Sequence, residues 1–275
     1  MSAPGASMRG RHVVITRLNL ALDFAASRER LDLAWLQARL EPFERFCHPS
    51  MRVQRAPHDW LVLVDAHTPA AIRARLDALP GFATVPLAQP HTAQALGAAL
   101  ADHVDLQGAT HLITTRLDSD DALGDRHLEI VQRHVHPVSA PEFLNLPVGY
   151  RTHAGRHFAC VDPANAFLSL VEPLQGGVPP RTAYCVAHPA AATVAPVRQV
   201  WTRPLWLQVI HDDNEVSALT GLRRPWGGVP HHFRAQPRAA RATARDGARD
   251  LLRSAGYARR VFLLRRTYSQ PRRRK

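Results

Sequence analysis

Three carboxylates lie close together in the sequence, at Asp118, Asp120 and Asp121. They directly follow the apolar segment 111–115, and their charges repel one another unless water or a cation compensates them. If the strand continues, Asp118 and Asp120 point to the same side, because side chains alternate along a strand. Oxygen ligands of this kind suit Mg²⁺ or Mn²⁺, which complete their coordination with substrate phosphate oxygens and water. The alternative is a solvated loop before a helix N-terminus, where aspartate is also favourable.

Strands and helices in alternation must position this cluster. The first half of the chain has short, β-branched apolar segments that predict strands at 12–17, 60–64 and 111–115. Apolar residues at helical spacing predict helices at 27–40, 70–79, 92–106 and 127–134. This order predicts an α/β fold with a mostly parallel sheet covered by helices on both faces. Arg17, Asp65 and the aspartate cluster then lie at the carboxyl ends of strands, where such sheets bind ligands.

Local residues refine the predicted boundaries. Pro42 and Pro49 are expected to bound the piece that follows the first helix. Thr68 is expected to cap the next helix, with Pro69 at its first position. In the second half, glycine and proline turns separate short predicted strands at 148–151, 158–161, 166–171, 184–188 and 206–211.

The positive charge of the chain is concentrated at one end. The 275 residues carry a formal net charge of +12. Residues 223–275 hold 16 basic and 2 acidic residues, whereas residues 1–222 hold 19 basic and 21 acidic ones. We therefore expect a near-neutral domain at 8–220 and a basic, partly helical extension at 221–275. The three cysteines are scattered, and no apolar run reaches membrane-spanning length, so a cytoplasmic protein is expected.

Several segments resemble one family when they are taken in order. They are Ile15–Asn19, Pro49–Met51 with Gln54, Trp60–Asp65 with Thr68 and Pro69, Thr115–Leu123, Phe167–Glu172, and Trp206–His211 with Asn214. The segment Thr115–Leu123 resembles the D-x-D region of GT-A glycosyltransferases. The ordered set, over residues 12 to 215, resembles the rhamnosyltransferase family of bacteria. Leu18 departs from it, because an aromatic residue is expected there, and the basic extension lies outside the resemblance.

The resemblance implies a GT-A fold and transfer of a sugar, such as rhamnose, from a nucleotide-sugar such as dTDP-rhamnose to a glycan or lipid-linked acceptor. It implies that Asp118 and Asp120 hold Mn²⁺ or Mg²⁺ and the donor, assisted by Asp121, and that Arg116 lies near ribose or phosphate. The nucleoside pocket is implied to contain Thr16, Arg17 and Asp65. An equal alternative for Arg17 and Arg116 is an ion pair with the aspartates.

Two further roles are open. His211 closes an apolar strand, and GT-A enzymes often recruit a late histidine to the metal; the alternative is a hydrogen-bonded histidine at a strand end. His188 is a weaker candidate of the same kind. An inverting transferase also needs a carboxylate base, for which Glu172 and Asp213 are the candidates. The alternative for Glu172 is a water-facing residue at a strand end.

The rival functions use other features of the sequence. An Asp-cluster phosphohydrolase is disfavoured, because no Thr or Val follows in the D-x-D-x-[TV] manner and the only lysine is Lys275. A nucleic-acid-binding protein would use the basic extension, which the near-neutral body disfavours. The extension is also amphipathic, so contact with an anionic membrane surface is the second reading of it beside a solvated end.

Overall fold

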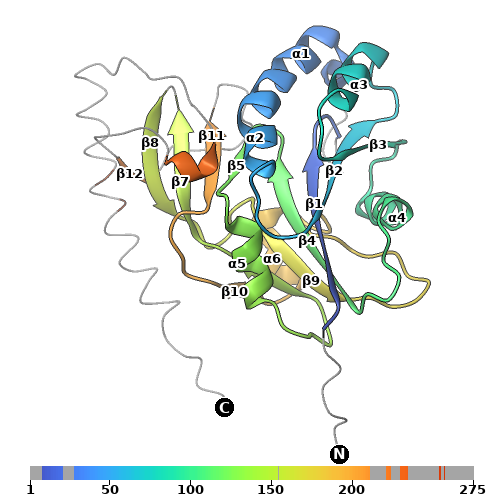
Figure 1. Cartoon of the computed structure of the whole chain (residues 1–275), viewed down its shortest axis with the longest axis vertical. Coiled ribbons are helices and arrows are strands. Elements are labelled where there is room, and N and C mark those ends of the chain that lie inside the picture. The colour runs from blue at the N-terminus through green and yellow to red at the C-terminus, as the bar shows by residue number, and fades with distance from the viewer. Residues whose placement is uncertain are drawn as a thin grey trace, which may run out of the picture.

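A computed structural model describes residues 8–20, 28–153, 155–210, 221–223 and 230–234, together with Ser254 and Tyr257. The larger of its two sheets contains, in spatial order, β10 (Val197–Gln199), β6 (Glu142–Asn145), β9 (Ser169–Pro173), β4 (His111–Asp118), β1 (Gly10–Arg17), β2 (Asp59–Asp65) and β3 (Ala83–Leu87). The smaller sheet contains β12 (Leu222–Arg223), β8 (Arg156–Val161), β7 (Val148–His153), β11 (Trp206–Ile210) and β5 (Ala122–Leu123). It lies beside the larger sheet (Figure 1).

The centre of the larger sheet is parallel. Strand β1 pairs in parallel with β2 on one side and β4 on the other, and β2 pairs in parallel with β3. Strand β9 runs antiparallel between β4 and β6. The mostly parallel α/β sheet predicted from the sequence is therefore confirmed. Its parallel register brings the carboxyl ends of β1, β2 and β4 to one edge, where residues far apart in sequence can form a site.

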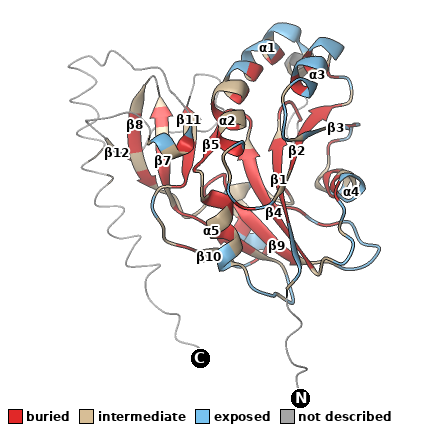
Figure 2. Ribbon diagram, in the orientation of Figure 1, coloured by how far each residue is buried: buried red, intermediate tan, exposed pale blue. Residues whose placement is uncertain are grey.

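Helices cover both faces of this sheet. They are α1 (Leu33–Pro42), α2 (His48–Met51), α3 (Ala70–Asp77), α4 (Ala93–His103), α5 (His127–His134) and α6 (Ala191–Val194), with 3₁₀ turns at Arg28–Leu31, His188–Ala190 and His231–Phe233. On one face, α1, α2 and α3 pack against Val14 and Val62, and on the other face α4 packs against Val13 and Ile15. The central strands are buried, whereas α1 and α3 turn exposed residues outward (Figure 2).

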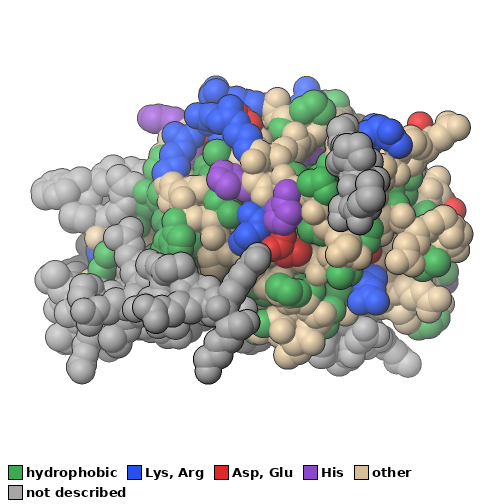
Figure 3. Space-filling model, turned by 90° about the horizontal axis from the view of Figure 1, so that it is seen from below, with side chains coloured by type: hydrophobic (Ala, Val, Ile, Leu, Met, Phe, Trp, Pro, Cys, Tyr) green, Lys and Arg blue, Asp and Glu red, His purple; other side chains and the backbone are tan. Residues whose placement is uncertain are grey.

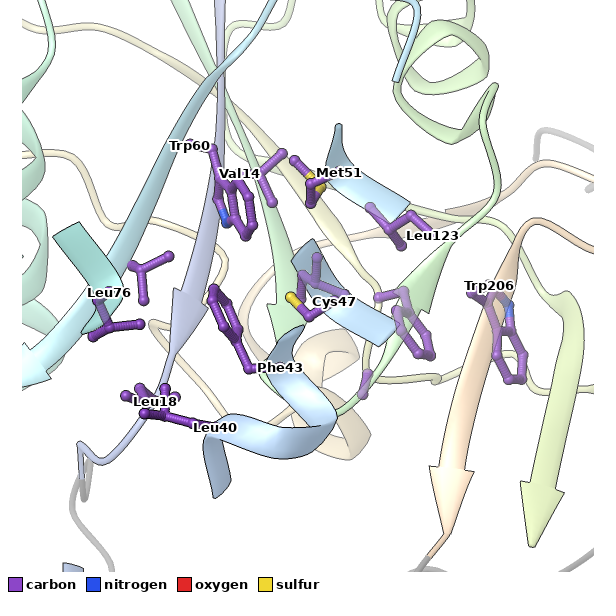
Figure 4. Close-up of a cluster of buried hydrophobic side chains, with 14 of the residues drawn as sticks. Val14, Leu18, Leu40, Phe43, Cys47, Met51, Trp60, Leu76, Leu123 and Trp206 are labelled. Atoms are coloured by element: carbon purple, nitrogen blue, oxygen red, sulfur yellow. The ribbon is translucent and has the colours of Figure 1, made fainter. Parts of the chain in front are cut away.

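One cluster of buried hydrophobic side chains contains residues from both sheets, such as Val14 of β1 and Trp206 of β11. Phe43 and Trp60 pack with their ring centroids 5.9 Å apart beneath α1. At the other end of the cluster, Phe167 stacks on Trp206 of β11 at 5.1 Å. Figure 4 shows these buried side chains converging from the central sheet, the α1–α2 segment and β11. Trp206 is fully buried, so it packs the core.

Residues beyond 220 contribute to the packed body. Strand β12 pairs with β8, and Phe233 is buried against Tyr150. Tyr257 donates to the carbonyl of Val161 at 2.9 Å. The rest of the basic extension, on which the predictions of membrane contact and partial helicity depend, lies outside the described residues.

Several predicted boundaries were wrong for identifiable reasons. Pro42 lies inside a continuous helical segment, because a π-helical stretch, Phe43–Cys47, carries the chain from α1 into α2. Pro69, not Thr68, is the residue before α3, since the Thr68 hydroxyl donates to Asp65 O at 2.6 Å. The predicted strand 184–188 consists of turns and a 3₁₀ start.

Candidate functional site

Arg17 and Asp118 lie side by side at the carboxyl edge of the parallel sheet. They are the last residues of β1 and β4, and the parallel register pairs them directly. Arg17 Nη2 lies 3.7 Å from Asp118 Oδ1. Arg116, two residues before Asp118 on β4, projects to the same face of the sheet, because strand side chains alternate. The fold thus gathers two guanidinium groups and a carboxylate that the sequence predicted to bind the donor.

Tyr184 is the residue against which both arginines pack. Its ring centroid lies 4.6 Å from Arg17 Cζ and 4.4 Å from Arg116 Cζ. The Tyr184 hydroxyl donates to Ile15 O of β1 at 3.2 Å, which anchors the ring beneath the strand. Sequence reasoning did not single out Tyr184, because one aromatic residue in a short apolar run is more often part of the core. Only the tertiary structure brings it under the arginines.

The two guanidinium groups keep unused hydrogen-bond donors. Within the described part of the chain, the buried Nε atoms of Arg17 and Arg116 have no hydrogen-bond partner. Arg116 Nη1 donates to Val186 O at 3.3 Å. Burial lowers the pKa of Arg116, and Arg17 lowers it further, while Tyr184 and Asp118 raise it. Buried donors without acceptors are costly, so this arrangement suits an anionic ligand that accepts from them.

The other two aspartates lie in the turn after β4. Strand β4 ends at Asp118, so the predicted alternation does not extend to Asp120. Asp120 Oδ2 lies 3.2 Å from Arg39 Nη1 of α1, and Asp121 Oδ1 accepts from the backbone N–H of Val209 at 2.8 Å. Burial raises the pKa of Asp121 well above its usual range, and the charges of Asp120 and Asp118 raise it further. The three carboxylates therefore form one electrostatic cluster, and Asp120 and Asp121 are buried rather than splayed into solvent.

The chemistry of this cluster fits a divalent cation. The available ligands are hard carboxylate oxygens from three aspartates, and two of these side chains are buried. No group of three acidic, histidine or cysteine side chains among the described residues is arranged to hold a metal ion. Mg²⁺ is usually held by one or two carboxylates together with substrate phosphates and water, so a three-residue protein cage is not required.

Two predicted nucleoside-pocket residues have other surroundings. Thr16 is fully buried on the opposite face of β1 from Arg17, and its hydroxyl accepts from Trp60 Nε1 at 3.0 Å. Asp65 ends β2 as predicted, but its carboxylate accepts from Gln89 Nε2 at 3.0 Å and from the His67 N–H at 2.7 Å. Burial raises the pKa of Asp65, but these hydrogen bonds lower it by more. Thr16 and Asp65 thus bond within the protein and are not brought against the arginines.

Glu172 lies at the far end of the sheet. It pairs with Leu112 near the start of β4, six residues before Asp118, which is about 20 Å along a strand. The expectation of a water-facing residue is wrong, because Glu172 is buried and accepts from the N–H groups of Arg181 and Thr182. This position gives no support to Glu172 as the candidate base. His211 and Asp213 lie outside the described residues.

His188 lies near the arginine pair. Its Nδ1 lies 2.6 Å from Ala164 O, so this nitrogen carries the proton and Nε2 is left as an acceptor. Burial lowers the pKa of His188, and the charge of Arg116 lowers it further.

The opposite end of the sheet holds a separate cavity. It has a volume of about 540 Å³ and is lined by Arg11, His12, His58, Asp59 and Gln132, among others. Figure 3 views the molecule from this lower side, where arginine, histidine and carboxylate side chains gather near the middle of the face. Arg11 pairs with Asp59 at 2.6 Å, and the ring nitrogens of His12 bond to Thr115 Oγ1 and Gln132 Nε2, so these polar groups already have partners within the protein.

Together, the mostly parallel sheet, the helices on both faces and the charged carboxyl edge define an α/β protein with arginine and aspartate side chains at its strand ends, the edge where such sheets hold their ligands. The chain belongs to the family described as "Putative rhamnosyl transferase", whose model matches residues 20–222. It is accordingly a glycosyltransferase, and the resemblance stated from the sequence is confirmed. None of the curated proteins compared with the chain matches it.

Two solved structures are similar to this chain. One is a "putative nucleotide-diphospho-sugar transferase" from Desulfovibrio desulfuricans G20, at 10% identity and a TM-score of 0.36, covering 74% of this chain and 83% of that one. The other is S. aureus TarS 1-349, at 10% identity and a TM-score of 0.37, covering 72% of this chain and 60% of that one.

No helix of the described residues combines the length and the apolar character that a membrane span requires.

Proposed function

We propose that this glycosyltransferase binds the diphosphate of a nucleotide-sugar donor at the edge formed by Arg17, Arg116 and Asp118. The observation that supports the proposal is the pair of buried Nε donors without partners. A diphosphate offers many acceptor oxygens, and the planar guanidinium group matches phosphate geometry. In the leaving nucleoside diphosphate, negative charge develops on the oxygen that was bonded to the sugar. Two fixed guanidinium groups stabilise that charge, which is electrostatic catalysis.

The cation of the proposal is Mn²⁺ or Mg²⁺, held by Asp118 and Asp120 with assistance from Asp121. His211 is the fourth candidate ligand. When bound, such a cation would neutralise the diphosphate as it leaves. The ion pairs of Asp118 with Arg17 and of Asp120 with Arg39 already connect these carboxylates to positive charge. We infer that Arg17 and Arg39 hold these two carboxylates in place before the donor arrives.

The proposed reaction is a direct displacement. The acceptor hydroxyl oxygen forms a bond to the anomeric carbon while the bond from that carbon to the diphosphate oxygen breaks. The electron pair of the breaking bond stays on the nucleoside diphosphate, and the hydroxyl proton passes to a carboxylate base. Asp213 is the candidate base that remains, since Glu172 lies at the other end of the sheet. Turnover that survives Asp213→Ala would remove Asp213 from this role.

The donor and acceptor are proposed from the family. We propose dTDP-rhamnose as the donor and a surface glycan or lipid-linked sugar as the acceptor, used in the cytoplasm. The basic extension would place the enzyme on an anionic membrane where a lipid-linked acceptor lies. Pelleting with anionic liposomes tests this contact, and equal pelleting after truncation at residue 257 rejects it.

A thermal-shift panel tests the proposed function. Wild-type protein is heated with UDP, GDP or dTDP, each with and without Mn²⁺, and with the matching nucleosides as controls. We expect one diphosphate to raise the melting temperature, more so with Mn²⁺, because ligands that bind only the folded state stabilise it. The nucleosides should have little effect. If none of the diphosphates stabilises the protein under either condition, the proposal is rejected.

A further inference from the structure

The segment that carries Tyr184 is held in a strained turn by side chains from the central sheet. Thr182 has φ of 62°, in the left-handed region that a β-branched residue rarely adopts. It is fully buried. Strained backbone of this kind persists only where the surrounding structure enforces it, and it is found most often at functional sites.

The enforcing contacts come from β9 and β4. Glu172 Oε2 accepts from the N–H of Arg181 at 3.0 Å, and Glu172 Oε1 accepts from the N–H of Thr182 at 3.1 Å. Thr114 Oγ1 of β4 accepts from the N–H of Ala183 at 2.8 Å. Three successive backbone donors are thus fixed by two side chains. Both oxygens of the Glu172 carboxylate accept hydrogen bonds from this turn, which explains why a buried acid lies on β9.

The turn at Arg181–Ala183 determines where Tyr184 lies. Its hydroxyl donates to Ile15 O on β1. The turn that precedes it is bonded to Thr114 on β4, so Tyr184 is held by both of these strands. A ring so fixed orients the guanidinium planes of Arg17 and Arg116, which both lie within 4.6 Å of its centroid. Cation–π contact occupies the flat faces of the guanidinium groups, and their Nε donors have no hydrogen-bond partner within the described residues.

Building on the proposed function, we propose that Tyr184 and Glu172 are positioning residues that hold Arg17 and Arg116 as a preformed receptor for the donor diphosphate. Tyr184 acts through its ring on the two arginines, and Glu172 acts through the Arg181–Tyr184 turn on Tyr184. The receptor takes pyrophosphate-like anions without needing a metal, because its donors are the two guanidinium groups. Preorganisation of this kind increases affinity by removing the cost of ordering long side chains on binding.

The test measures the affinity of inorganic pyrophosphate for the full chain by calorimetry, with EDTA present. Wild type should bind it, and Tyr184→Leu should weaken binding about ten-fold or more, since charge-assisted hydrogen bonds are lost or misaligned. Tyr184→Phe keeps the ring but loses the hydroxyl that bonds to Ile15 O, so its affinity should lie between those of wild type and Tyr184→Leu. Tyr150→Leu is the matched control, because Tyr150 is another buried tyrosine that packs on Phe233 in the smaller sheet.

A second pair of variants keeps the proposal testable if Tyr184→Leu does not fold. Glu172→Gln retains one acceptor oxygen for two backbone donors and should weaken pyrophosphate binding several-fold. Glu142→Gln is its control, since Glu142 pairs with Arg198 on β10. In turnover assays, the positioning variants should raise KM for the donor more than they lower kcat.

The outcomes separate this inference from the proposed function. Unchanged pyrophosphate affinity in Tyr184→Leu, or in Glu172→Gln where the leucine variant is unfolded, overturns the positioning roles. So does a wild type that binds a nucleoside diphosphate with Mn²⁺ but never binds pyrophosphate. A wild type that binds neither pyrophosphate nor any nucleoside diphosphate overturns the proposed function as well.

Discussion

Arg17 ends β1 and Asp118 ends β4 at the same register position, with Arg17 Nη2 3.7 Å from Asp118 Oδ1. The pairing places opposite charges at the edge where a parallel sheet binds its ligands. Both side chains are about one quarter exposed, so the pair is accessible from solvent while the Nε of Arg17 is buried.

Removing Arg17 should weaken binding of the nucleoside diphosphate. We expect Arg17→Ala to lower the affinity about 10- to 100-fold, because a charge-assisted hydrogen bond contributes roughly 1.5–3 kcal/mol. Arg11→Ala is the control, since Arg11 lies on the same strand but pairs with Asp59 at its amino end. Calorimetric titration measures both variants. Equal affinities for the two would show that the charge at the carboxyl edge has no role in binding.

Asp118 should determine the effect of the metal. In Asp118→Asn, we expect Mn²⁺ to add no stabilisation beyond that given by the diphosphate alone, because a neutral amide is a poor ligand for a hard cation. Asp59→Asn, which removes the acid that pairs with Arg11 at the amino end, should keep the full effect of Mn²⁺. The stabilisation by Mn²⁺ is measured as the difference in melting temperature with and without the ion. A Mn²⁺ effect that persists in Asp118→Asn removes this residue from the metal site.

Gly97 should tolerate no side chain. A Cβ atom at Gly97 of α4 would lie 2.0 Å from the carbonyl oxygen of Pro180, which is backbone and cannot swing aside. We expect Gly97→Ala to lower the free energy of unfolding by about 1–3 kcal/mol, the usual cost of overpacking. It should also weaken pyrophosphate binding, since the displaced segment leads into the turn before Tyr184.

The control for this glycine is Gly176, where an added Cβ meets nothing within 4 Å. Gly176→Ala should leave both stability and binding close to wild type. Urea unfolding and calorimetry on the two variants make the comparison. If Gly97→Ala proved as stable as Gly176→Ala, the close approach of α4 to Pro180 would be wrong.

Two buried histidines should make the fold sensitive to acid. Burial lowers the pKa of His12 to about 3, with further lowering by His58 and His127, and burial lowers the pKa of His127 to about 4. Both folded values lie below the unfolded value of 6.5, so the stabilisation is complete above pH 6.5 and is lost as the pH falls below it. Between pH 7.5 and 5.5 we expect each histidine to remove about 1.4 kcal/mol of stability.

Urea unfolding across this pH range checks the prediction. His12→Gln combined with His127→Gln should flatten the decline in the free energy of unfolding between pH 7.5 and 5.5. His134→Gln, at an exposed position of α5, should leave the decline as it is in wild type. An unaltered slope in the double variant would assign the acid sensitivity to other groups.

The sequence was sufficient for the elements of the central sheet. The apolar segments at 12–17, 60–64 and 111–115 became the three central strands, and the helix predicted at 127–134 has the same bounds in the structure. A parallel strand buried on both faces must be a continuous apolar run, so the local sequence is enough to locate it. The same local chemistry placed Arg17, Asp65 and Asp118 at strand ends, because a strand end follows directly from where the run stops.

The tertiary structure alone decided which of these residues meet. Thr16 and Arg17 are neighbours in sequence, yet strand alternation buries one beneath Trp60 and sets the other beside Asp118. Glu172 lies far from Asp118 because β9 runs antiparallel to β4, a direction that no local pattern specifies. Tyr184 reaches the arginines through a turn whose φ at Thr182 is strained and is held by long-range hydrogen bonds. Contacts between distant segments depend on register, strand direction and backbone strain, and these are fixed only when the whole chain packs.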